Sequence, residues 1–177
     1  MVYMSTSKQL FIMTKILLIG PSGVGKTSAL NLLKDDYELI AYDLDQLIKE
    51  DLNVDSVSKY FSEYGNENFF TKSKEIIEKI ANPKKILIAV GAGSIDYTES
   101  HEWYKKQNII TLTGDPKIIY ERSDRKEYHQ TLDNYLTTEF SKIRKELYAN
   151  SKIIIDTTSL TKEQVAETIK EIINNYS

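Results

Sequence analysis

Eight consecutive residues near the start of the chain have the types and spacing of a phosphate-binding loop. They occupy positions 20–27 and fit the pattern GxxxxGKT. Glycines let backbone N–H groups approach phosphate oxygens, and a helix that begins here adds the positive end of its dipole. We expect Lys26 to reach the β- and γ-phosphates of a nucleotide and the Thr27 hydroxyl to bind a bridging Mg²⁺. The predicted nucleotide contacts are Gly20, Ser22, Gly23, Val24, Gly25, Lys26, Thr27 and Ser28.

The residues on either side of this loop support the same interpretation. An apolar run at 15–19 precedes it, and apolar residues at helical spacing follow it at positions 29, 30, 32 and 33. This is the order of strand, glycine loop and helix in which the motif is meaningful. An ordinary glycine-rich turn is the alternative, but four specified residues at the right spacing over eight positions in this context are hard to obtain by accident.

The composition limits the classes of protein to which the chain can belong. A chain of 177 residues with no cysteine and a net charge of −3 fits one domain in a reducing compartment, without disulfides or thiolate metal sites. Lysines are spread along the chain and form no basic stripe, so nucleic acid is not an expected partner. No apolar run is long enough to span a bilayer. We therefore expect a soluble, cytoplasmic monomer, with residues 1–13 as a leader or extension.

Short apolar runs alternate with stretches of helical period along the rest of the chain. Four further runs predict strands buried on both faces, at 39–42, 86–90, 109–112 and 153–155. Helical period appears at 69–80, 116–122, 136–147 and 162–173. Asp115 and Pro116 predict the start of the second of these helices, with a carboxylate cap and a proline in the first turn. The alternation predicts a three-layer α/β/α domain over residues 14–177, with a five-stranded parallel sheet of the kind found in P-loop kinases.

Two of these strands end in residues that could act on a ligand. In an open parallel sheet, ligands bind beyond the carboxyl ends of the strands. Asp43 and Asp45 follow the second strand, where one carboxylate could support Mg²⁺ and the other could bind an acceptor hydroxyl and help take its proton. The alternative is that one of them only caps a helix at 46–51. Gly91, Ala92 and Gly93 follow the third strand and could bring backbone close to a ligand, or form a plain tight turn.

With these motifs in place, the chain resembles the shikimate kinase family, from about residue 15 to about residue 173. The resemblance rests on five motifs in the family's order and spacing: GPSGVGKT, YDLDQLIKE, KYFSEYGNENFF, VGAG and RKELY. It implies an enzyme that transfers the γ-phosphoryl group of ATP, with Mg²⁺, to an alcohol of a small molecule. Agreement of all five is far more specific than any one motif alone.

The resemblance also implies roles for single residues. Lys26 and Thr27 would serve ATP and Mg²⁺, Asp43 would support the metal, Asp45 would bind the acceptor hydroxyl, and the turn at 91–93 would line the acceptor site. Three arginines would complete the site, unless they are plain surface residues: Arg144 on an anionic group of the acceptor, Arg122 on adenine, and Arg125 in a lid at about 123–136.

The chain departs from the family pattern mainly at the acceptor site. Phe70 stands where the family has an arginine that grips the substrate carboxylate, so an aromatic ring replaces a guanidinium. Ser73 replaces an acidic residue, and Ala92 replaces the middle glycine of a triplet. Lys72 or Lys74 could reach in from the next turn, although an ammonium lacks the fork geometry. The lid segment lacks the family's RPLL and carries Tyr128 and His129.

Three readings of function remain open at this point. The first is phosphorylation of shikimate. The second is a kinase for a different hydroxylated small molecule, with Phe70 packing against a less charged ring. The third is a non-catalytic nucleotide-binding protein that uses lid closure as a switch for a partner. A GTPase is disfavoured because no guanine-reading Thr/Asn-Lys-x-Asp pattern follows a strand.

Overall fold

The computed structural model describes residues 15–123 and 131–175 and has a central sheet of five parallel strands. Their order across the sheet is β2-β3-β1-β4-β5, so β1 lies in the middle. The continuous apolar runs therefore form a parallel sheet, as predicted. The strands are β1 (Lys15–Ile19), β2 (Leu39–Asp43), β3 (Lys85–Ala89), β4 (Ile109–Thr113) and β5 (Ile153–Asp156).

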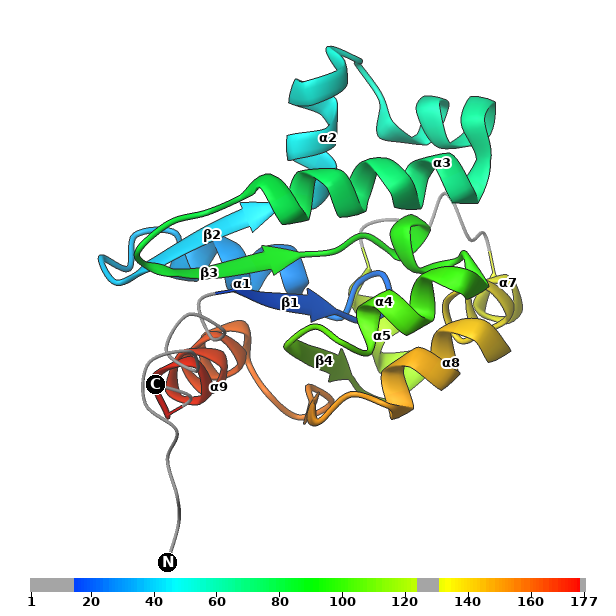
Figure 1. Ribbon diagram of the computed structural model, residues 1–177. Coiled ribbons are helices and arrows are strands. Elements are labelled where there is room, and N and C mark those ends of the chain that lie inside the picture. The colour runs from blue at the N-terminus through cyan, green and yellow to red at the C-terminus, as the bar shows by residue number, and fades with distance from the viewer. Residues whose placement is uncertain (1–14, 124–130, 176–177) are drawn as a thin grey trace, which may run out of the picture.

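Helices connect the strands and cover both faces of the sheet (Figure 1). The longer ones are α1 (Lys26–Leu33), α2 (Leu44–Leu52), α3 (Val57–Lys79), α7 (Leu132–Glu139), α8 (Lys142–Ala149) and α9 (Lys162–Asn175). The short ones are α4 (His101–Tyr104), α5 (Pro116–Arg122) and the 3₁₀ turns η1 (Ala92–Ile95) and η2 (Thr98–Ser100). The predicted three-layer α/β/α class is confirmed.

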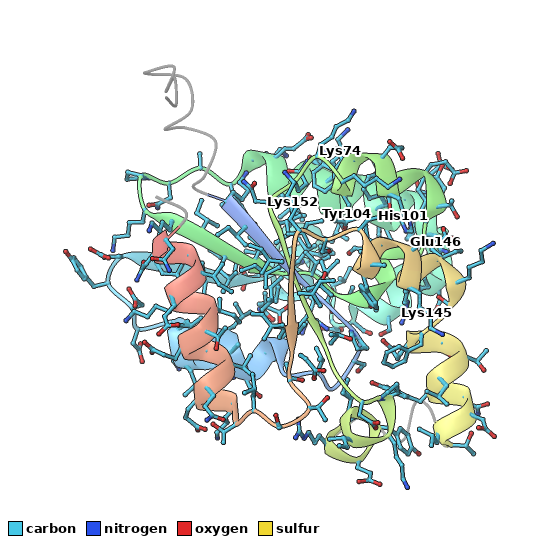
Figure 2. All side chains as sticks on the ribbon, turned by 90° about the horizontal axis from the view of Figure 1, so that it is seen from below. Lys74, His101, Tyr104, Lys145, Glu146 and Lys152 are labelled. Carbon is cyan, nitrogen blue, oxygen red and sulfur yellow. The ribbon has the colours of Figure 1, made fainter. Side chains whose placement is uncertain are left out.

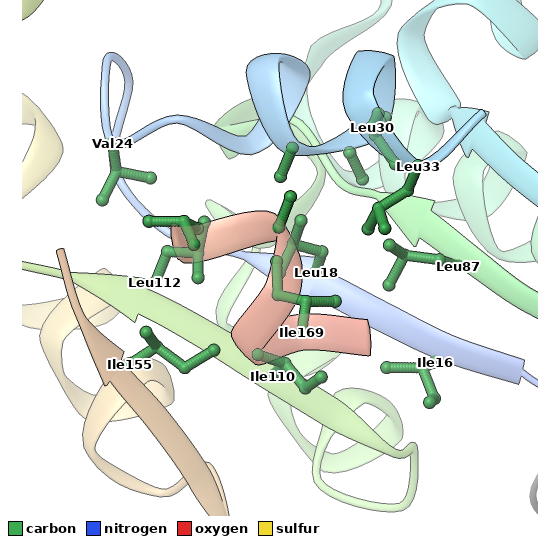
Figure 3. Packing of buried hydrophobic residues seen from close by; sticks show 14 of the residues in the cluster. Ile16, Leu18, Val24, Leu30, Leu33, Leu87, Ile110, Leu112, Ile155 and Ile169 are labelled. Atoms are coloured by element: carbon green, nitrogen blue, oxygen red, sulfur yellow. The ribbon is translucent and has the colours of Figure 1, made fainter. Parts of the chain in front are cut away.

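Two hydrophobic clusters fill the space between the layers. One joins alternate residues of β1, β3 and β4 to α1, α5, α7 and α9, and Figure 3 shows Ile169 of α9 packing over Leu18 and Ile110. The other joins the remaining strand residues to α2, α3, α4 and α8. Leu17 and Leu18 belong to different clusters, because neighbouring strand residues point to opposite faces. Burial on both faces explains the unbroken apolar runs.

The predicted start of α5 is confirmed in detail. The Asp115 side chain accepts hydrogen bonds from the N–H groups of Lys117 and Ile118, at 2.9 and 3.1 Å. Pro116 occupies the first turn, where its missing N–H costs nothing. A carboxylate cap followed by proline therefore fixes where the chain leaves β4 and turns back.

Two expectations about helix bounds are wrong. The helix expected at 69–80 begins at Val57, because α3 continues across a kink at Gly65, whose φ of 76° is readily adopted only by glycine. The single helix expected at 136–147 is two helices. Phe140 leaves helical geometry, and the Ser141 side chain then caps α8 by accepting from Arg144 N at 3.5 Å. Helical spacing continues through the break, so periodicity alone misses it.

Some expectations lie outside the described residues. The predicted lid arginine, Arg125, falls there, as do Tyr128, His129 and the segment 1–13. The later part of the predicted lid does lie within the structure, where residues 132–136 form the start of α7. Across residues 15–123 and 131–175, no helix has both the length and the apolarity to cross a membrane.

Replacement of Ile169 by alanine should weaken the packing of α9 on the sheet. The side chain is fully buried, so Ile169→Ala leaves a cavity and should lower the free energy of unfolding by about 2–5 kcal/mol in chemical denaturation. Leu32→Ala in α1 is the control, because Leu32 is 45% exposed and its truncation should change stability by less than about 0.5 kcal/mol. Equal losses in the two variants would contradict this assignment of the core.

Candidate active site

The strand order places the predicted functional residues around the end of β1. The phosphate loop follows β1, the glycine turn follows β3 beside it, and the aspartates follow β2, which pairs with β3. Val90 N donates to Leu18 O at 2.9 Å, so the ends of β3 and β1 remain hydrogen-bonded up to the loops. The carboxyl edge of the sheet therefore brings together segments that are far apart in the sequence, as predicted.

The phosphate loop has the backbone that its glycines permit. Gly20, Gly23 and Gly25 have φ values of 145°, 83° and 107°, which other residues rarely adopt. A Cβ on Gly20 would overlap the carbonyl oxygen of Leu112 in β4, so the loop starts in direct contact with the next strand. A Cβ on Gly25 would meet nothing within 4 Å. The loop is thus closed toward the sheet and accessible where α1 begins.

Lys26 lies at the first turn of α1 with its ammonium group folded over the loop. Its Nζ donates to the carbonyl oxygens of Gly20 and Pro21, at 2.6 and 3.0 Å. These contacts hold the positive charge over the loop. To contact a phosphate group, as predicted, the ammonium would have to give up these carbonyl partners.

Helix α7 holds the phosphate loop by both backbone groups of Ser22. Ser22 N donates to Glu139 Oε2 at 2.8 Å, and the Tyr135 hydroxyl donates to Ser22 O at 2.7 Å. Tyr135 and Glu139 are four residues apart on α7 and are almost fully buried. The predicted nucleotide contact Ser22 therefore directs its N–H to Glu139. Sequence reasoning missed both α7 residues, although their spacing is a signal that they share a helix face.

The two aspartates after β2 have different positions. Asp43 is the N-cap of α2, since its Oδ1 accepts from the N–H groups of Asp45 and Gln46, at 3.0 and 3.4 Å. The capping role considered from the sequence is therefore real and uses one carboxylate oxygen. Asp45 instead extends across to the glycine turn, where a Cβ on Gly91 would come within 2.6 and 2.9 Å of its two oxygens. Asp45 and Gly91 are therefore brought together, and the role of Asp45 on an acceptor hydroxyl stays a prediction.

The turn at 91–93 begins the short 3₁₀ helix η1 and is fixed by buried hydroxyl groups. Ser94 N donates to Gly91 O at 3.2 Å, and the Ser94 hydroxyl hydrogen-bonds the hydroxyl of Ser73 at 2.9 Å. Ser73 also donates to Phe69 O at 2.7 Å, one turn back on α3. The serine that replaces the family's acidic residue therefore anchors the turn to α3.

Phe70, predicted to contact the acceptor, packs against other aromatic rings of the chain. Its ring centroid lies 5.8 to 6.0 Å from those of Trp103, Tyr104 and Tyr97. Tyr104 is fully buried, and burial raises the pKa of its hydroxyl. The position at which the resemblance expects a guanidinium is thus part of an apolar aromatic cluster.

Neither lysine near Phe70 supplies the missing positive charge. Lys72 pairs with Asp51 and Glu75 at 2.8 and 3.1 Å, and Lys74 lies 3.9 Å from Glu78. The hydrogen bonds to Asp51 and Glu75 raise the pKa of Lys72. The hypothesis that one of these lysines reaches into the acceptor site receives no support from their positions.

Arg144 is buried in α8 and holds two carboxylates. Its Nε and Nη2 donate to Asp96 Oδ1 and Oδ2 at 2.6 and 2.7 Å, a bidentate pair. Its Nη1 lies 2.8 Å from Glu139 Oε2, an ion pair without hydrogen-bond geometry. Burial opposes the charge of the guanidinium, but Asp96 and Glu139 outweigh it and hold the pKa of Arg144 above its ordinary value.

The position of Arg144 excludes one alternative drawn from the sequence. The reading of Arg144 as a surface residue is wrong, because only 5% of it is exposed. The next two residues, Lys145 and Glu146, lie at the outside of the molecule, whereas Tyr104 and His101 of α4 point inward (Figure 2). Asp96, three residues beyond the glycine turn, was not predicted from the sequence.

Arg122 lies at the other side of the site, beside the loop after β5. Its Nη1 and Nη2 donate to the carbonyl oxygens of Thr157 and Thr158, at 2.9 and 2.7 Å. Arg122 is exposed, so its guanidinium plane is accessible. The predicted stacking of this group on adenine stays a prediction.

The residues present fit a Mg²⁺ ion that is held mainly by phosphate and water. Thr27 is exposed at the start of α1, and Asp43 retains a second carboxylate oxygen beside the cap. Among the residues that the structure describes, no three Asp, Glu, His or Cys side chains converge as a metal site. Mg²⁺ commonly binds through one or two protein oxygens plus substrate phosphates, so this sparse set is sufficient.

A separate apolar hollow lies at the opposite end of the sheet. Its lining includes Ile16, Ile109 and Ile153, near the amino ends of β1, β4 and β5, together with Leu147. It contains none of the predicted site residues. Since ligands of open parallel sheets bind at the carboxyl ends of the strands, we assign the active site to the edge with the phosphate loop.

Comparison with known proteins agrees with the fold. The family model "Shikimate kinase" matches residues 22–174. A shikimate kinase of Thermodesulfovibrio yellowstonii is 31% identical over 162 residues, covering 89% of this chain and 93% of the relative. One of Bacillus cereus is 27% identical over 166 residues, covering 92% and 99%. The solved structure of shikimate kinase from Acinetobacter baumannii in complex with shikimate superposes with a TM-score of 0.73, at 22% identity and 95% and 97% coverage.

The sheet and the phosphate loop define a P-loop fold, and the family match makes the protein an enzyme that transfers a phosphoryl group from ATP to a small molecule. The family model and the curated relatives match most of the chain, so they identify the family as well as this class. The chain belongs to the shikimate kinase family. The resemblance inferred from five short motifs is thereby confirmed.

A methyl group at Gly91 should displace the Asp45 carboxylate. The backbone at Gly91 (φ −66°, ψ 151°) suits any residue, so Gly91→Ala should fold, but its Cβ would overlap both Asp45 oxygens. We expect kcat for acceptor phosphorylation to fall about 10²-fold, with the KM for ATP unchanged. Asp45→Asn should cause a similar loss, and adding Gly91→Ala to it should have little further effect. Full additivity of the two losses would refute the proposed displacement.

Proposed function

We propose that this protein catalyses the ATP-dependent phosphorylation of a hydroxyl group of shikimate. The observation that carries the proposal is the junction of Asp45 and Gly91 beside the phosphate loop, in a chain that belongs to the shikimate kinase family. This junction provides a carboxylate at the edge of the sheet where the phosphate loop places the nucleotide.

The phosphate loop would bind and orient the nucleotide. Backbone N–H groups of the loop and of the first turn of α1 would donate to phosphate oxygens, and the ammonium group of Lys26 would exchange its carbonyl partners for the β- and γ-phosphates. Mg²⁺, held by Thr27 and through water by Asp43, would neutralise charge that develops between the β- and γ-phosphates. Arg122 would lie against adenine, beside the loop after β5.

Asp45 would position the acceptor. Its carboxylate would accept a hydrogen bond from the reacting hydroxyl and take the proton as the oxygen bonds to the γ-phosphorus. The bond between that phosphorus and the bridging oxygen of ADP breaks in the same transfer. Little covalent chemistry is needed from the protein, so positioning and charge neutralisation account for most of the catalysis.

The carboxylate of shikimate would bind at Arg144. It is the arginine that the RKELY motif supplies, and the position that corresponds to the family's second arginine is Phe70, within the aromatic cluster. We therefore expect weaker retention of the acceptor carboxylate than two guanidinium groups would give, because charge-assisted pairs supply much of such binding.

The test is release of ADP with Mg-ATP, with and without shikimate, by the whole chain. Shikimate should stimulate ADP release, and Lys26→Ala should lower kcat/KM by about 10²–10³-fold, because it removes a group that stabilises charge in transfer. Lys34→Ala is the matched control, since this exposed lysine ends the same helix away from the loop. ATP binding without stimulation by shikimate would reject this acceptor.

A further inference from the structure

Three charged side chains form a buried ion cluster between the glycine turn and the phosphate loop. Arg144 lies at its centre, with Asp96 on its Nε–Nη2 edge and Glu139 on Nη1. The exposed fractions of the side chains are 6% for Arg144, 6% for Glu139 and 25% for Asp96. We call these three residues the buried ion cluster.

Asp96 lies beside the segments that would bind the acceptor. It directly follows η1, the short helix that begins in the glycine turn, and its carbonyl oxygen accepts from Asn66 Nδ2 at 3.4 Å. The ring of the next residue, Tyr97, packs on Phe70. The carboxylate of Asp96 therefore occupies Arg144 in the region where a carboxylated acceptor needs this guanidinium.

The charges of the cluster oppose the binding of another carboxylate. One guanidinium faces two carboxylates, so the cluster has a net charge of −1. A third carboxylate would be repelled, and a bidentate edge of a guanidinium holds only one carboxylate at a time. An acceptor carboxylate can bind Arg144 in this geometry only after one of the two present has left.

Asp96 is the member whose departure costs least. Glu139 Oε2 contacts both Arg144 Nη1 and Ser22 N, and loss of its charge from the interior would remove the partner of both groups, although Asp96 would still pair with the rest of the guanidinium. Asp96 is the most exposed of the three and can be solvated when it turns away from Arg144. Glu139 would meanwhile keep Arg144 partly neutralised and attached to the phosphate loop.

We propose that Asp96 is a specificity-determining residue: it occupies the Nε–Nη2 edge of Arg144 in the free enzyme, and the carboxylate of the acceptor displaces it. The proposal rests on the proposed function and deepens it. Asp96 then lowers the affinity for carboxylated acceptors and has no such effect on an uncharged analogue. Arg144 acts on the acceptor, while Glu139 is a positioning residue that links it to the phosphate loop.

The experiment removes the charge of Asp96 and leaves its shape. In Asp96→Asn, the KM for shikimate and its Kd from titration calorimetry should both fall about tenfold, because a neutral amide competes less well than a carboxylate for the guanidinium. The KM for ATP should not change. The methyl ester of shikimate, which carries no negative charge, should bind the wild type and Asp96→Asn equally. If Asp96→Asn does not fold, Asp96→Ser removes the same charge and should show the same fall.

Asp36→Asn is the matched control variant. Asp36 also forms an ion pair, with Lys170 at 2.9 Å. This pair joins the loop after α1 to α9, away from the acceptor site, so the variant should leave the KM for shikimate unchanged. An unchanged or higher KM and Kd for shikimate in folded Asp96→Asn would overturn the proposal. A purely structural role would weaken binding of shikimate and of its methyl ester alike.

Calorimetry separates this proposal from the proposed function. If the wild type phosphorylates shikimate and Asp96→Asn binds it no more tightly, the function stands and the role of Asp96 is wrong. If no variant phosphorylates shikimate but Asp96→Asn binds it more tightly than the wild type, the role of Asp96 stands and the proposed reaction is wrong.

Discussion

The contact between the start of the phosphate loop and the neighbouring strand is the constraint on which the site depends. Gly20 directly follows β1 and lies so close to Leu112 of β4 that a Cβ on Gly20 would overlap the carbonyl oxygen of Leu112. Because β1 lies between β3 and β4, the loop is fixed at the middle of the sheet edge, with the glycine turn on one side and α5 on the other. This geometry needs buried strands, so the two hydrophobic clusters that cover both faces of the sheet also position the chemistry.

Polar contacts then connect the two halves of the site. Helix α7 binds both backbone groups of Ser22, and Glu139 of that helix also pairs with Arg144, which in turn holds Asp96 beside the glycine turn. A single buried chain of charges thus links the segment that would bind phosphate to the segment that would bind the acceptor. Arg144 and Glu139 are costly to leave unpaired because they are buried, so their ion pair fixes α7 and α8 relative to each other, and the cluster limits which acceptor groups can reach Arg144.

The sequence was sufficient to predict the parts of this protein that depend on local pattern. Continuous apolar runs predicted the parallel strands, the glycine spacing predicted the loop, and Asp115 with Pro116 predicted the start of α5. Contacts across the fold were not predictable in this way. Glu139 lies 117 residues along the chain from its partner Ser22, and Asp96 lies 48 residues from its partner Arg144. No local pattern marks such pairs. The break between α7 and α8 was missed because apolar spacing continues through it, while the start of α8 depends on a single serine N-cap.

The central claim is that this site transfers a phosphoryl group to a hydroxyl group of shikimate. Phosphorus NMR of the whole chain with Mg-ATP and shikimate tests it most directly, because it distinguishes transfer from hydrolysis. We predict a new phosphomonoester resonance that grows in equal amount with ADP and couples to a ring proton of shikimate. Formation of ADP with inorganic phosphate alone, or no reaction, would contradict the account.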